Sequence, residues 1–68
     1  MNGRVVWTEM SKGGLIRADS GEPAVWRFRW SSCWLHPCSI GHDSPVRFER
    51  GSIHGPIGDA LNVRELDD

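Results

Sequence analysis

Glycine and proline limit the fold of this chain more than any other feature. Eight glycines and four prolines are spread through 68 residues, and one of them interrupts almost every window long enough for three turns of helix. Short runs rich in β-branched and aromatic residues remain between them, and such runs favour strands. They predict five strands, at residues 3–8, 15–19, 24–30, 46–50 and 60–66. Five short strands separated by turn residues predict an all-β fold, a small antiparallel barrel.

The length of the chain limits what the barrel can do. A domain of this size buries only about 60% of the surface that its unfolded chain exposes, so residues 1–68 are expected to form one domain with a thin core. Such a core supplies few walls for a deep catalytic cleft. No pair of carboxylates and no Ser/His/Asp set stands out in the sequence. We therefore expect a binding module that is not an enzyme and needs no cofactor.

Charge is unevenly distributed along the chain. The net charge is −1, but residues 1–34 carry five basic and three acidic side chains, whereas residues 35–68 carry three and six. A local basic patch is therefore possible on a weakly acidic protein. No apolar run approaches the length of a membrane span, and the first ten residues lack the apolar segment of a signal peptide. We expect a cytoplasmic protein that does not contact membranes.

Four potential metal ligands lie close together in the sequence. Cys33, His36, Cys38 and His42 are of the types that zinc prefers. Their spacing is tighter than in the usual zinc knuckles, and Pro37 limits how they can converge. We therefore expect no metal site and interpret these residues as incidental loop residues. The two cysteines are expected to be free thiols, because two are too few for a secreted disulfide framework and cytosolic thiols stay reduced.

Five stretches of the chain resemble the motifs of bacterial cold-shock proteins, in the order of that family. They are "MNGRVVWT" (1–8), "KGGLI" (12–16), "WRFRWSSC" (26–33), "VRFE" (46–49) and "GPIGDALNV" (55–63). The last stretch has two residues more than the family motif. This resemblance spans nearly the whole chain. It implies a five-stranded OB-fold barrel of cold-shock type that binds single-stranded RNA or DNA and serves as an RNA chaperone or a regulator of transcription and translation.

The chain departs from this family on the surface that binds the bases. Members of the family stack bases on exposed Phe rings. Here Thr8 follows the tryptophan where the family has Phe, and Leu15 stands in place of a Phe of the first motif. Arg27 and Arg29 replace the exposed Phe and His of the second motif. Charge thus replaces stacking, and two phosphate contacts would add roughly −1.4 to the slope of log affinity against log salt.

Strand alternation assigns a face to each residue of "VWRFRW", residues 25–30. Trp26 and Phe28 match core positions of the resembling family and share a face with Ala24, so Arg27 and Arg29 point outward. From the residues alone the opposite assignment is favoured, because a row of rings opposite a row of arginines is itself a plausible base-stacking surface. The resemblance places Trp30 at the end of this strand, on the side that binds nucleic acid.

The predicted function is binding of single-stranded RNA or DNA, by a monomer, through one face of the barrel. The alternative is a protein-interaction module that keeps the barrel and has lost the nucleic acid, with a protein as its partner. Each site residue also has a structural interpretation: the arginines as a solvated face, and the tryptophans, including Trp34 of the long loop, as packing residues. The predicted nucleic-acid-binding residues are Trp7, Lys12, Leu15, Arg27, Arg29, Trp30 and His54.

Overall fold

A computed structural model describes residues 1–32 and 42–66 of the chain. Almost all of the regular structure is strand. The elements are β1 (Asn2–Glu9), β2 (Gly13–Ala18), β3 (Val25–Arg29), a single turn of 3₁₀ helix η1 (Trp30–Ser32), β4 (Pro45–His54) and β5 (Ile57–Glu65). Within the described residues, no helix is long and apolar enough to cross a membrane.

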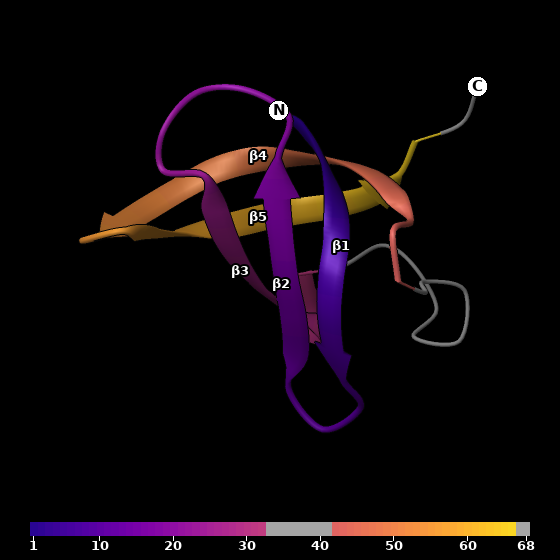
Figure 1. Ribbon diagram of the computed structural model, residues 1–68. Coiled ribbons are helices and arrows are strands. Elements are labelled where there is room, and N and C mark those ends of the chain that lie inside the picture. Colours follow the sequence, from indigo (N-terminus) through magenta and orange to yellow (C-terminus); the bar gives the residue numbers. More distant parts are fainter. Residues whose placement is uncertain (33–41, 67–68) are drawn as a thin grey trace.

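The strands form a closed barrel in the order β1-β2-β3-β5-β4, with β4 returning to β1. The predicted all-β, OB-fold-like barrel is therefore confirmed. In Figure 1, β1 and β2 stand upright and cross β4 and β5, which run behind them. One pairing differs from the sequence prediction of an antiparallel barrel, because β3 pairs with β5 in parallel. This parallel pair joins the meander β1-β2-β3 to the hairpin β4-β5.

The core consists of side chains from all five strands that alternate with exposed residues. One row of directly opposed residues crosses four strands, from Val5 through Ile16 and Trp26 to Gly58. Gly58 has no side chain because the Trp26 ring lies against it: a Cβ there would lie 2.5 Å from the ring. The eight buried core residues, each at most 2% exposed, are Val5, Ile16, Trp26, Phe28, Val46, Phe48, Ala60 and Val63.

The strand boundaries differ from the prediction mainly at the β4–β5 hairpin. Residues 51–59 are rich in glycine and proline and were expected to form a loop, but most of them belong to the two long strands. Only Gly55 and Pro56 turn the chain, and Gly55 has a φ of 64°. Pairing between the strands overrides the weak local preference of these residues. At β3 the strand begins at Val25, so Ala24 is exposed outside it and does not share the inner face.

Candidate nucleic-acid interface

An outward-facing row of side chains crosses β1, β2, β3 and β5. Trp7 lies opposite Leu15, Leu15 opposite Arg27, and Arg27 opposite Asp59. Residues directly opposite each other on neighbouring strands share a face of the sheet. Trp7 is 50% exposed, so a large part of its ring is accessible on this face. The row therefore offers a ring, an aliphatic side chain and a guanidinium group side by side.

The exposure of Trp7 depends on an irregularity in β1. Val5 faces the core, so strict alternation would turn the residue two positions later inward as well. The register with β2 shifts between Val5 and Trp7, where Val5 lies opposite Ile16 and Trp7 opposite Leu15. Such a bulge inserts one extra residue and reverses the alternation that follows it. This local shift turns the Trp7 ring away from the core and toward solvent.

Beside this row lies an open hollow of about 700 Å³ between the ends of β1, β2 and β3. Gly13 lies at its centre, opposite Glu9 on one side and Arg29 on the other. A side chain at Gly13 would collide with the backbone of β3, and its φ of 152° also disfavours one. The missing side chain therefore allows β2 to lie close to β3 beside the hollow. The charged residues that line it are three cations and one carboxylate: Lys12, Arg27, Arg29 and Glu9.

Trp30 forms a wall of the hollow. Its indole N–H donates a hydrogen bond of 2.8 Å to the backbone carbonyl of Glu9, and its ring packs edge-on against Phe28 with centroids 5.3 Å apart. Its backbone N–H also donates to the carbonyl of Lys12. The half-buried ring and the backbone of Trp30 thus tie η1 to the β1–β2 turn, in which Lys12 lies. Trp30 has less free ring surface than Trp7 to offer a base.

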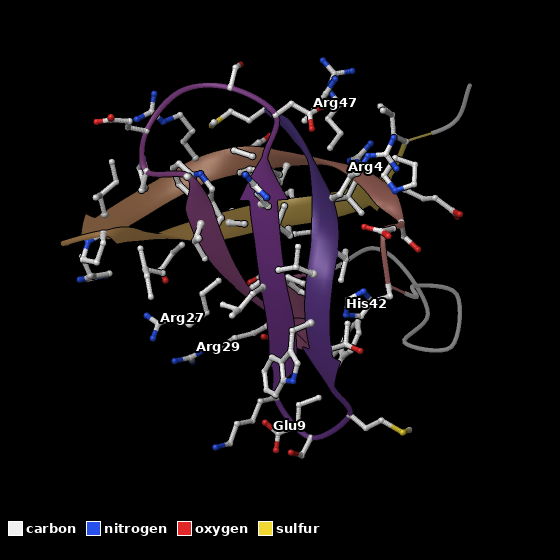
Figure 2. The ribbon with its side chains drawn as sticks, in the orientation of Figure 1. Arg4, Glu9, Arg27, Arg29, His42 and Arg47 are labelled. Carbon is white, nitrogen blue, oxygen red and sulfur yellow. The ribbon has the colours of Figure 1, made fainter. Side chains whose placement is uncertain are left out.

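Arg27 and Arg29 differ in their partners, although both point outward on the same side of the barrel (Figure 2). The Nε and Nη2 atoms of Arg27 donate to Oδ1 of Asp59 at 3.2 and 3.0 Å. The other carboxylate oxygen of Asp59 lies 3.1 Å from Nε2 of His54. Arg29 forms no ion pair with any described residue. Of these two arginines, Arg29 is therefore the one whose charge is available to a ligand.

Asp59 stays ionised at neutral pH. The hydrogen bond from Arg27 holds the pKa of Asp59 below its ordinary value of 3.8, although partial burial opposes the change. The charge of Arg27 and the contact with His54 lower the pKa further. An ionised Asp59 places a negative charge on the face that the sequence predicts to be basic. It both holds the guanidinium of Arg27 in place and repels phosphate groups.

Most of the predicted binding residues come together in the structure. Six of the seven line the hollow, and His54 lies outside it, joined to Arg27 only through Asp59. The sequence analysis missed Asp59 because its segment looks like a loop. The alternating small residues Gly58 and Ala60 were the only signal of an inward strand face there. The predictions for Trp34 and for Cys33, His36 and Cys38 lie outside the described residues.

No family model matches the chain, and no curated protein matches it. The assignment of a function therefore depends on the motifs quoted above, the barrel and the geometry of this face.

Proposed function

We propose that the chain is a single-stranded nucleic-acid-binding module of cold-shock type, which acts in the cytoplasm on RNA or DNA. The observation that carries the proposal is the row from Trp7 through Leu15 to Arg27 beside a hollow lined by Lys12 and Arg29. Proteins that bind single strands combine rings that stack on bases with cations that follow the backbone. Both elements lie on this one face. Only unpaired bases can stack on Trp7, because a duplex keeps the faces of its bases covered.

The arrangement supports binding with little sequence preference. Trp7 offers a stacking surface that every base can use, and stacking contributes about 1–3 kcal/mol per base. Lys12 and Arg29 supply charges for phosphates without selecting a base. The planar guanidinium of Arg27, held by Asp59, offers a second flat surface next to Leu15. These contacts fit the chaperone or regulatory role that the resemblance to cold-shock proteins implies.

A titration with short oligonucleotides tests this proposal. Oligo-dT and oligo-U are added at low salt while tryptophan fluorescence is followed, and stacking on Trp7 is expected to quench it. The Trp7→Ala variant lacks this reporter, so its binding is measured with labelled oligo-dT, and it should be weaker by about 1–3 kcal/mol. Ile53→Ala is the matched control, because Ile53 is equally exposed, at 49%, but lies on the β4–β5 hairpin away from the hollow. Absence of binding by the parent protein at high micromolar concentrations would refute the proposal.

One surface favours the second candidate function, a protein-interaction module. An apolar hollow of about 640 Å³ lies between the segment before β3 and the β4–β5 hairpin. Pro23, Val25, Ile53 and Pro56 line it, and exposed apolar surface of this kind occurs at protein interfaces. The same titration separates the two functions, because a protein-interaction module binds neither oligonucleotide.

A further inference from the structure

A second group of arginines lies on the outer surface of the barrel, away from the hollow. Arg17 on β2 lies opposite Arg4 on β1. Arg47 on β4 lies opposite Asn2, two residues before Arg4, and its other neighbour is Arg64 on β5. Figure 2 shows Arg4 and Arg47 near one end of the barrel and Arg27 and Arg29 near the other. We refer to Arg4, Arg17 and Arg47 as the arginine band.

The arginine band places like charges together, although Nη1 of Arg4 also donates a hydrogen bond of 3.1 Å to the backbone carbonyl of Asp43. Like charges directly opposite each other on neighbouring strands destabilise a sheet. All three side chains are exposed, and none belongs to the core. Within the part of the chain that the structure describes, none of the three forms an ion pair, even though Asp19 and Asp43 line the same shallow hollow as Arg4 and Arg17. An anionic ligand would relieve this repulsion.

The arginine band continues the candidate binding face. Arg17 follows Leu15 by two positions on β2, so both side chains leave the same face of the sheet. Residues two apart in a strand are separated by about 6.6 Å. The pair Arg17 and Arg4 therefore forms the next outward row after Leu15 and Trp7. A nucleic-acid strand that crosses Trp7 and Leu15 in this direction reaches the arginine band without leaving the surface.

We propose that the arginine band is a second, phosphate-binding segment of the nucleic-acid surface, which holds the backbone of a strand longer than the face around Trp7 can cover. The proposal rests on the proposed function. Among the described Trp and Phe residues, only Trp7 has a side chain that is at least half exposed, and it lies outside the band. The band therefore offers charge without stacking. Contacts of this kind position a strand and carry no sequence information.

The test compares oligo-dT of about 3 and about 20 nucleotides, one shorter and one longer than the usual site sizes of about 4–16 nucleotides per OB fold. The variant Arg4→Gln/Arg17→Gln/Arg47→Gln should bind the short strand like the parent and the long strand more weakly. Three phosphate contacts correspond to a slope difference of about 2.1, which makes the loss about 20-fold larger at 50 mM than at 200 mM salt. Arg17→Gln alone should change the slope by about 0.7. Arg50→Gln is its control: it removes one exposed positive charge from β4 outside the band, together with the contact of this guanidinium with the Trp26 ring and its hydrogen bond to the carbonyl of Glu22. It should leave the slope for the long strand nearly unchanged.

The outcomes separate this inference from the proposed function. If the parent binds the short strand and the triple variant binds both lengths like the parent, the arginine band has no role and only this inference fails. If the affinity of the triple variant falls equally for the short and the long strand, the band is not a distinct segment and the inference is overturned. The same holds if Arg50→Gln changes the salt slope as much as Arg17→Gln does. A parent that binds neither length refutes both. Thermal unfolding of each variant shows that the barrel is intact, and the single Arg17→Gln variant decides the question if the triple variant does not fold.

Discussion

The ion pair between Arg27 and Asp59 predicts that the two arginines of β3 contribute unequally to binding. From the sequence both would contact phosphate, and the structure shows that only Arg29 is free of a carboxylate among the described residues. The Arg27→Gln variant should therefore change the slope of log affinity against log salt by less than Arg29→Gln does, because a guanidinium that is paired with Asp59 contributes little to phosphate contacts, although the variant also leaves the charge of Asp59 uncompensated. The Arg29→Gln variant should flatten the slope of log affinity against log salt by about 0.7. Between 50 and 200 mM salt, that slope corresponds to about a 2.6-fold change in relative affinity.

Removing the carboxylate gives the complementary result. Asp59 lies 3.0 Å from Arg27, well within the screening length of about 10 Å at 0.1 M salt. The Asp59→Asn variant releases the charge of Arg27 and removes a charge that repels phosphate. Its slope should therefore steepen by about 0.7, and its affinity at low salt should exceed that of the parent. His54→Gln is the control, because it leaves the pair of Arg27 and Asp59 in place.

The assay is a titration of each variant with labelled oligo-dT at four or more salt concentrations between 50 and 300 mM. The result that refutes the reasoning is an equal flattening of the slope by Arg27→Gln and Arg29→Gln, together with an Asp59→Asn variant that follows the parent. In that case the ligand displaces Asp59 at no cost, and the ion pair seen in the free protein does not control binding.

Three further predictions concern stacking, packing and acid stability. The Trp7→Ala variant should bind oligo-dT more weakly by about 1–3 kcal/mol with an unchanged salt slope, since stacking releases no counterions; a flattened slope would contradict this. Gly58→Ala should lower the free energy of unfolding in urea by about 1–3 kcal/mol, because the new methyl group meets the Trp26 ring, and a neutral result would show that the ring can move aside. The pKa of Asp59 is lower in the folded than in the unfolded protein, so the stability that it provides is complete above its unfolded pKa and is lost as the pH falls through the folded pKa. The difference in urea stability between the parent and Asp59→Asn should therefore begin to narrow as the pH falls below about 4, whereas a difference that does not change with pH would assign it to another cause.

The sequence pattern predicts the barrel well wherever the strands alternate clearly. Phe28 and Trp26 face the core and Arg27 and Arg29 face solvent, as alternation together with the cold-shock resemblance predicts. The prediction also fails at Ala24 and for the parallel pairing of β3 with β5. The largest failure is the segment around Gly55, where small residues fill the inner face of the hairpin. Gly58 and Ala60 are buried, but neither is apolar enough to mark a strand in the sequence. Long-range pairing with β3 and β4 determines the structure there.

The candidate site is predictable in its residues but less so in its electrostatics. Trp7, Lys12 and Arg29 lie around one hollow, in agreement with the motifs that suggest them. The pairing of Arg27 with Asp59 joins two strands 32 residues apart, and no local pattern contains that information. The same holds for the bulge that exposes Trp7. Both features depend on how whole strands pair with each other. A local sequence pattern does not determine this pairing, because it results from all the contacts of the fold together.

The parallel seam between β3 and β5 also has a consequence for the order of events during synthesis on the ribosome. β1, β2 and β3 are neighbours in the chain and in the sheet, and local pairings of this kind form quickly. The face that carries Arg27 is completed only by Asp59, which is translated 32 residues later. A nascent chain that has exposed β1 to β3 therefore presents Trp7 and an uncompensated Arg27 before β5 emerges. Such a chain would meet nucleic acid, the ribosome's own RNA included, with one positive charge more on this face than the finished barrel has.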